Sequence, residues 1–109
     1  MIPIIHSVYL AGLFDGEGCA GVWKLKHRKT PAPIVTLSMT TRAPVKFCHD
    51  IYGGYFRDGF KKIPGNKSVY EWRVSHRQAL KVAMDLIPYV RNPEKIEQLG
   101  RILEHYGVV

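Results

Sequence analysis

The stretch SVYLAGLFDGEG, residues 7–18, decides how this chain folds. Ser7 is a candidate N-cap, and the residues after it are apolar on nearly every side, which predicts a buried helix over 7–15. Ala11 and Gly12 are small, so the backbone of a second helix could approach closely there. The glycines that follow end the helix and release the chain into an extended segment.

The pattern beyond this helix predicts a sheet and further helices. In 34–40, Val35, Leu37 and Met39 alternate with polar residues, as in a half-buried strand. Glycine and proline clusters mark the chain reversals. The predicted strands are 19–27, 34–40, 55–60 and 68–74, and the predicted helices are 42–52, 76–90 and 93–106. We therefore expect one α+β domain over 1–109, in the order α-β-β-α-β-β-α(-α), with a four-stranded antiparallel saddle sheet whose outward face is polar.

Composition excludes several classes of protein. The 109 residues are 46% apolar and 23% charged, values typical of a folded globular domain. No apolar run is long enough to span a membrane, and MIPIIHSVYL lacks the features of a secretory signal. The two cysteines form no disulfide framework and no CxxC motif, which favours a reducing compartment.

Positive charge is concentrated in the middle of the chain. Residues 19–77 contain twelve lysines and arginines and three acidic residues, a net +9, whereas the two flanks together carry −2. A basic middle on a weakly acidic frame predicts one positive face, and the commonest polyanion is nucleic acid.

Residues on the outward sheet positions and in the hairpin loops are the candidates for reading DNA. They are Lys24, Lys26, Arg28, Lys29, Thr36, Ser38, Thr40, Tyr55, Arg57, Lys61, Lys62, Lys67, Glu71 and Arg73. The first strand leaves two registers open. In one register the outward residues are Gly21, Trp23, Leu25 and His27. In the other they are Lys24, Lys26 and Arg28, which polarity favours and which a β-bulge near Gly21 would support.

Residues 10–18 read LAGLFDGEG, and this nonapeptide resembles the signature of the LAGLIDADG homing endonucleases. Seven of the nine positions are chemically close, with Phe14 for isoleucine, Gly16 for alanine and Glu17 for the last aspartate. The order of elements and the tail LIPYVRNPEKIEQL are similar to the same family. The resemblance implies a nuclease that uses Mg²⁺ (or Mn²⁺). Because one motif supplies one acid site, it also implies a symmetric homodimer paired through the motif helices.

The resemblance further implies roles for single residues. Glu17 would bind the metal, with the carbonyl of Gly16 as a second ligand, since hard oxygen donors suit Mg²⁺. Asp15 would cap the partner helix. The expected dimer interface is Leu10, Ala11, Gly12, Leu13 and Asp15.

Two basic residues complete the implied active site. The family places a lysine near the start of its last helix, where a gapless match puts Pro93; of the flanking Arg91 and Lys95, we favour Lys95. Arg42 matches a region where the family places a polar residue near the catalytic water.

These observations predict a site-specific endonuclease that hydrolyses both strands of a DNA target as a metal-dependent homodimer. We expect no membrane partner and no organic cofactor. One alternative is a nucleic-acid-binding module of the same fold that does not cleave, either an RNA-splicing maturase or a DNA-binding regulator. Another is a generic basic α+β protein. The expected location is intracellular, in a prokaryote, a phage-infected cell or an organelle, with the gene in an intron, in an intein or free-standing.

Overall fold

The computed structural model describes residues 2–24, 26–27, 29–61 and 63–108. The elements are α1 (Ile4–Glu17), β1 (Gly18–Trp23), β2 (Ala32–Met39), α2 (Arg42–Tyr52), β3 (Tyr55–Phe60), β4 (Val69–Ser75), α3 (His76–Leu86) and α4 (Pro93–His105). The strands pair antiparallel in the order β1-β2-β4-β3. The predicted α+β class and element order are therefore confirmed. Within the described ranges no helix is long and apolar enough to cross a membrane.

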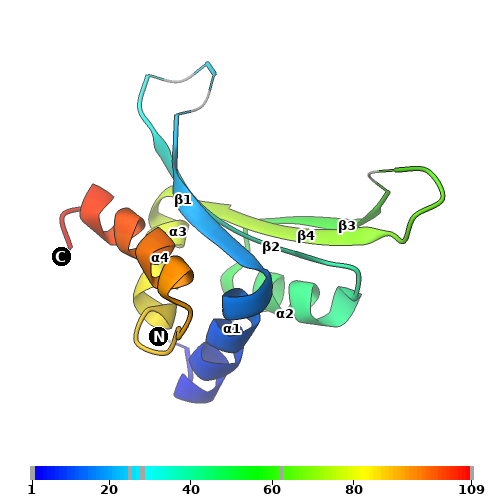
Figure 1. Ribbon diagram of the computed structural model, residues 1–109, viewed down its shortest axis with the longest axis horizontal. Coiled ribbons are helices and arrows are strands. Elements are labelled where there is room, and N and C mark those ends of the chain that lie inside the picture. The colour runs from blue at the N-terminus through cyan, green and yellow to red at the C-terminus, as the bar shows by residue number, and fades with distance from the viewer. Residues whose placement is uncertain (1, 25, 28, 62, 109) are drawn as a thin grey trace.

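The molecule has two layers, a curved sheet and the helices that cover one side of it (Figure 1). Val35, Leu37, Trp72 and Val74 point from the strands into the core, and each is at most 3% exposed. In the part of the chain that the structure describes, no helix covers the other side of the sheet, which we call the outer face (Figure 1). The β1–β2 and β3–β4 hairpins project from different ends of the sheet, so the outer face between them is concave (Figure 1).

Helix α1 is longer than the sequence predicts. It begins at Ile4, because Pro3 fits the start of a helix and its carbonyl accepts hydrogen bonds from the backbone N–H of His6 and Ser7 at 3.0 and 3.2 Å. Ser7 is therefore a buried residue inside the helix, and its prediction as N-cap is wrong. The helix ends after Glu17, at Gly18, where any side chain would overlap the ring of Phe14.

The remaining bounds agree closely with the predicted ones, apart from β1 and from α3, which ends at Leu86 and not at residue 90. The second helix covers 42–52 as predicted and stops at Gly53, which has a φ of 71° that favours glycine. Strand β1 ends at Trp23 and not at residue 27, since the chain turns at Lys26 and His27. The last helix begins with Pro93 after Asn92, whose side chain accepts from the backbone N–H of Glu94 at 3.0 Å.

Candidate nucleic-acid interface

Rows of side chains cross the outer face, because residues paired between antiparallel strands point to the same side. The row nearest the end of α1 consists of Ser38, Glu71 and Arg57. The next row consists of Cys19, Thr36, Arg73 and Tyr55, and a third of Gly21, Ile34 and Ser75. The strand residues predicted to read DNA therefore do share one face, and their contact with DNA stays a prediction.

Two arginines on the outer face are held against aromatic rings. The guanidinium carbon of Arg57 lies 3.8 Å from the ring centroid of Phe60, and that of Arg73 lies 4.7 Å from the ring centroid of Tyr55. Such stacking fixes the plane of the guanidinium group and leaves its N–H donors free for other partners. Both arginines are exposed, so their donors face solvent.

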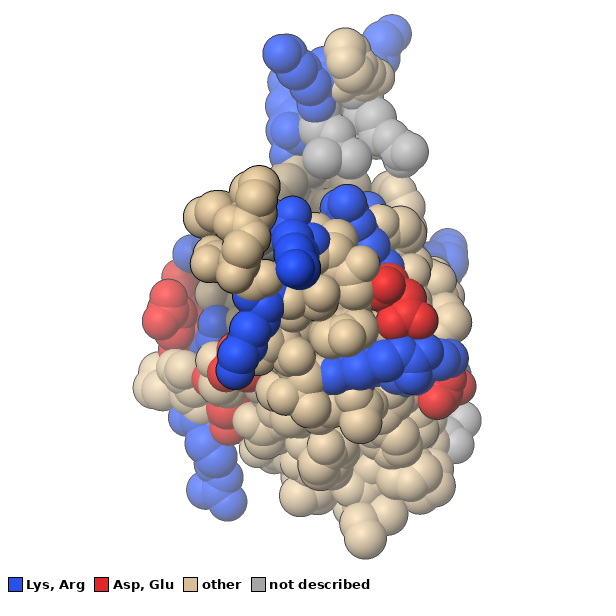
Figure 2. Space-filling model, turned by 90° about the vertical axis from the view of Figure 1, so that its right-hand side faces the viewer, with Lys and Arg blue, Asp and Glu red and all other residues tan. Residues whose placement is uncertain are grey.

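Positive charge extends from the outer face into the hairpins. Lys24, Lys26 and Lys29 are exposed in the β1–β2 loop, and Lys61 and Lys67 in the β3–β4 loop. In Figure 2, lysine and arginine side chains gather at the top of the view, over the β1–β2 hairpin, and continue across the middle. Arg28 and Lys62, also predicted to bind DNA, lie outside the described residues.

Strand β1 takes the first of the two registers that the sequence leaves open. Its pairing with β2 is continuous from Gly18 with Leu37 to Trp23 with Ala32, so no bulge occurs at Gly21. Cys19, Gly21 and Trp23 are outward, and Ala20 belongs to the core. The second register is therefore wrong for this strand. Lys24 and Lys26 follow the strand and reach solvent from the loop, while Leu25 lies outside the described residues.

Glu17 lies exposed at the C-terminal end of α1, beside the row of Ser38. It lines a hollow of ≈ 330 Å³ with Ser38, Met39, Thr40 and Val69. A second hollow of ≈ 430 Å³, lined by Thr40, Ile63, Asn66, Lys67 and Val69, shares Thr40 and Val69 with it. The depression therefore continues from the carboxylate to the β3–β4 hairpin, a place where a polyanion would meet both lysine and carboxylate.

The end of α1 and the edge strand β1 are fastened to α4. Lys95 donates from Nζ to the carbonyl oxygen of Gly18 at 2.6 Å, and the side-chain oxygen of Gln98 accepts from the backbone N–H of Ala20 at 2.9 Å. Lys95 and Gln98 are three residues apart on one helix face, and Gly18 and Ala20 are two apart on the edge strand. The sequence analysis singled out Lys95 and missed Gln98. The signal for Gln98 was its position three residues after Lys95, which places both side chains on the same face of the last helix.

Arg42 lies on the helix side of the sheet and not on the outer face. Its guanidinium donates to both carboxylate oxygens of Asp58, at 2.8 and 3.0 Å, and sits 5.6 Å from the ring centroid of Phe56, which packs against the core. This hydrogen-bonded pair raises the pKa of Arg42 and lowers the pKa of Asp58. The structure thus joins Arg42 to Asp58 and does not bring it to the hollow at Glu17; its catalytic role stays a prediction.

One chain offers few oxygen donors for a divalent cation. Among the described residues, no group of three or more histidine, cysteine, aspartate and glutamate residues could hold a metal. Gly16 and Glu17 occupy the last turn of α1, where carbonyl groups have no partner within the helix. The Glu17 carboxylate and the Gly16 carbonyl are hard donors that suit Mg²⁺, provided that a nucleic acid, water or a second copy completes the set.

The side of α1 away from the core is an exposed apolar stripe. Ile5, Tyr9, Gly12 and Gly16 follow one another at helical spacing; Ile5 is 74% exposed and Tyr9 47%. A Cβ atom added at Gly12 or Gly16 would meet no described atom within 4 Å beyond the neighbouring residues and the helix's own backbone. By contrast, Leu10 and Ala11 are 3% and 0% exposed in the chain's own core, so their prediction as interface residues is wrong. Gly12, Leu13 and Asp15 keep some exposed surface.

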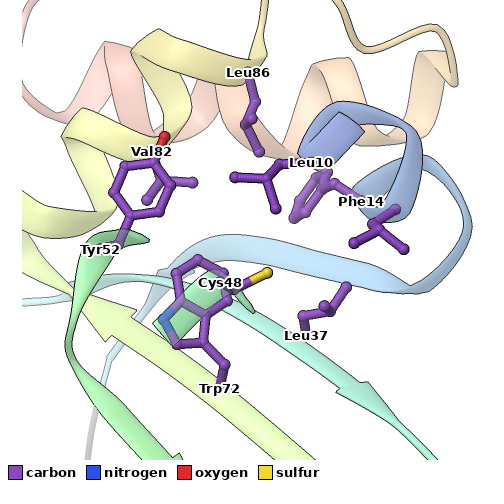
Figure 3. A pocket seen from close by; sticks show the side chains of 9 residues that line it. Leu10, Phe14, Leu37, Cys48, Tyr52, Trp72, Val82 and Leu86 are labelled. Atoms are coloured by element: carbon purple, nitrogen blue, oxygen red, sulfur yellow. The ribbon is translucent and has the colours of Figure 1, made fainter. Parts of the chain in front are cut away.

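The interior holds a small apolar cavity between α1, α2, α3 and the sheet (Figure 3). It measures ≈ 10 Å³, about the size of one water molecule, and its lining includes Leu10, Phe14, Cys48 and Trp72. Burial raises the pKa of the Cys48 thiol to about 12. At this edge the Tyr52 hydroxyl donates to Asp85 at 2.7 Å, and burial with this bond raises the pKa of the phenol. A cavity of this kind is a packing feature and not a ligand site.

No protein-family model matches the sequence, and no curated protein matches it either. Solved structures do match the fold. Two structures of the homing endonuclease I-CvuI in complex with DNA targets, one in the presence of Ca and one of Mg, superpose with TM-scores of 0.74 and 0.73 at 20% identity. They cover 93% and 92% of this chain, which spans 65% and 64% of their length.

A third neighbour is the group I intron-encoded homing endonuclease I-CeuI complexed with DNA, with a TM-score of 0.66 at 18% identity, covering 95% of this chain and 56% of its own. The LAGLIDADG homing endonuclease I-SmaMI bound to cleaved DNA has a TM-score of 0.65 at 17% identity. The match covers 93% of this chain and 36% of the I-SmaMI chain. The chain therefore has the fold of the LAGLIDADG homing endonucleases, and the resemblance seen in residues 10–18 extends to the whole architecture.

Proposed function

We propose that this chain is one subunit of a homodimeric, site-specific DNA endonuclease of the LAGLIDADG type. The observation that supports this most is the place of Glu17, an exposed carboxylate at the end of the motif helix and at the edge of a concave basic face. A carboxylate there would repel DNA unless a cation lay between them. The position therefore fits metal-assisted cleavage better than binding alone.

The exposed stripe on α1 supports the homodimer. A helix that is apolar all round is stable when all its sides are covered, and this chain covers one side of α1. Gly12 and Gly16 leave room for the backbone of a second α1 at close range. Two-fold pairing along this stripe would bring two Glu17 residues near the axis, one for each DNA strand.

Each part of the chain has a task in this reaction. The outer face and the hairpin lysines bind the phosphates and read base edges, and α4 holds β1 against the end of α1. Glu17 and Gly16 would hold Mg²⁺ or Mn²⁺. When bound, such a cation supplies an activated water and neutralises charge that develops on the phosphate. Cleavage of both strands would consume two water molecules, one added across a P–O bond of each strand.

Selection from a duplex pool with a randomised segment tests the proposal. Duplexes retained by the protein without divalent metal should be cut at a defined site once Mg²⁺ is added. The Glu17→Gln protein should retain the same duplexes and leave them uncut, whereas Glu104→Gln, which removes an exposed charge from α4, should cut at the wild-type rate. Retention of specific duplexes without cleavage by the wild type would instead identify a binding module that does not cleave.

A further inference from the structure

An apolar patch interrupts the polar outer face at the end of β1. The patch is formed by the exposed Trp23 and the half-buried Ile34, whose partners across β1 and β2, Ala32 and Gly21, are buried on the same side as Thr36 and Ser38. Trp23 is 42% exposed even though tryptophan is a large apolar side chain. Neither Trp23 nor Ile34 belongs to the motif at 10–18, to the core cluster or to the lining of the Glu17 hollow.

The indole of Trp23 is held flat along the strand by Gly21. A methyl group at position 21 would lie 3.1 Å from Cη2 and from Cζ2 of Trp23, so the six-membered ring sits beside the backbone of Gly21. Because the glycine has no side chain, the indole lies close to the sheet beside Gly21, which is itself buried, and presents its exposed side to solvent. Ile34, the residue paired with Gly21, is half-buried next to it.

The surroundings of the patch indicate what covers it. It is continuous with the rows that carry Arg73 and Thr36, and the loop directly after Trp23 presents Lys24, Lys26 and Lys29 to solvent. An apolar surface bordered by lysines fits a polyanion that also exposes apolar groups. In the major groove of duplex DNA that group is the C5-methyl of thymine.

We infer that Trp23 and Ile34 are specificity-determining residues that contact thymine methyl groups in the outer part of each half-site. This inference rests on the proposed function. From Gly18 to Trp23 the strand advances about 16 Å, which corresponds to roughly five base pairs along the duplex. Thymine should therefore be favoured about five base pairs outside the pairs that face Glu17.

The test uses duplexes selected by the wild-type protein, remade with deoxyuridine in place of thymidine at single positions. Deoxyuridine lacks the methyl group and keeps base pairing, so the affinity ratio isolates one contact. At the favoured outer positions the wild type should bind the uracil duplex about fourfold more weakly per methyl lost. Trp23→Gln should bind both duplexes equally, and Gly21→Ala, which displaces the indole by a few tenths of an ångström, should give an intermediate ratio. Lys26→Ala should weaken binding and keep the wild-type ratio.

The outcomes separate this inference from the proposed function. Because each ratio is measured within one protein, a loss of stability in a variant does not alter it. Selected duplexes without thymine at these positions, or equal ratios for the wild type and Trp23→Gln, would overturn the inference alone. A preference for single strands that Trp23→Gln abolishes would also overturn it, since the indole would then stack on unpaired bases. A protein that retains no duplex at all would overturn both.

Discussion

The side-chain carboxylate of Asp15 accepts a hydrogen bond from the backbone N–H of Asn92 at 3.0 Å, although the two residues are 77 positions apart. Asn92 returns the contact, donating from Nδ2 to the carbonyl of Asp15 at 3.2 Å, and the backbone N–H of Arg91 lies 3.1 Å from both carboxylate oxygens. The end of α1 is thus tied to the start of α4 in the same chain. The prediction that Asp15 caps the helix of a partner is replaced by this contact within the protomer.

Replacement of Asp15 should lower the stability of the fold. Asp15→Ala leaves the backbone donors of Arg91 and Asn92 without their acceptor, so the free energy of unfolding should fall by about 2 kcal/mol. Asp15→Asn keeps one acceptor oxygen and should cost about 1 kcal/mol. Urea denaturation followed by circular dichroism measures both. Asp50→Asn on α2, which breaks an exposed pair with Lys46, is the matched control and should change little.

Gly12→Leu should abolish the proposed homodimer without harming the isolated chain. Apart from the helix's own backbone and the two neighbouring residues, a Cβ atom at position 12 would meet no described atom within 4 Å, so the new side chain points toward the place of a partner helix. Sedimentation velocity should show a monomer, and circular dichroism should show an intact fold. A Gly12→Leu protein that sediments as a stable dimer would place the interface elsewhere. Gly100→Leu on α4 is likewise open at its Cβ and should remain a dimer.

DNA binding should depend steeply on salt, because the charge lies on the hairpins and the outer face. With about ten phosphate contacts in a dimer, affinity should fall by three to five decades between roughly 50 and 200 mM salt. A flat plot of log K against log salt would contradict the assignment of this face. Arg73→Ala should cost about 1–3 kcal/mol at one base pair, whereas Lys61→Ala should weaken all sequences alike and lower the salt slope by about 1.

The two cysteines should differ sharply in reactivity. Cys19 is exposed on β1, while Cys48 is buried with its pKa raised to about 12. At pH 8 a thiol reagent should therefore label Cys19 within seconds to minutes and Cys48 on the timescale of unfolding. Burial favours the neutral thiol, so Cys48 stabilises the fold fully below the pKa of the unfolded thiol, near 8.5, and this contribution is lost as the pH rises toward 12. Cys48→Ala should flatten stability against pH across that range, whereas rapid labelling of both thiols would contradict the buried position.

The sequence predicts the architecture well because its signals are local. The alternation in 34–40, the glycines at 53 and 54 and the proline at 93 each specify one segment, and the structure confirms them. The predicted start of α1 at Ser7 is wrong, because proline and serine are both common at the start of a helix and the helix begins after Pro3. An all-round apolar helix does not say which side meets the chain's own core, so the pattern alone did not exclude Leu10 and Ala11 from the interface.

The candidate site was harder to predict because it depends on contacts between distant segments. Glu17 stands out through the motif, but the partners of Asp15, Lys95 and Arg42 are set by how α4 and β3 return to the ends of α1 and α2. Arg42 is an example, because its partner lies 16 residues further along the chain. It was assigned from the family's pattern, as a polar residue near the catalytic water, and only the return of β3 brings Asp58 against it.

Lys95 has two possible roles, to fasten α4 to β1 and to supply positive charge to the reaction. Its ammonium group donates to the carbonyl of Gly18, directly after Glu17, and an ammonium group has three donors, so two remain for a phosphate or for water. If its charge serves the chemistry, Lys95→Met should lower single-turnover cleavage about a hundredfold while DNA affinity changes only a few-fold.

Lys95→Gln keeps a donor that can reach the Gly18 carbonyl but lacks the charge, and it therefore distinguishes fastening from catalysis. Cleavage by Lys95→Gln should be impaired as in Lys95→Met, while its unfolding free energy should exceed that of Lys95→Met by about 1 kcal/mol, the worth of one hydrogen bond. Gln98→Leu, which removes the neighbouring contact with Ala20, should lower stability and leave the cleavage rate of bound DNA near that of the wild type. If Lys95→Gln cleaves at the wild-type rate, the lysine only holds α4 against β1, and the cation that assists the reaction must be sought among the arginines and lysines of the outer face.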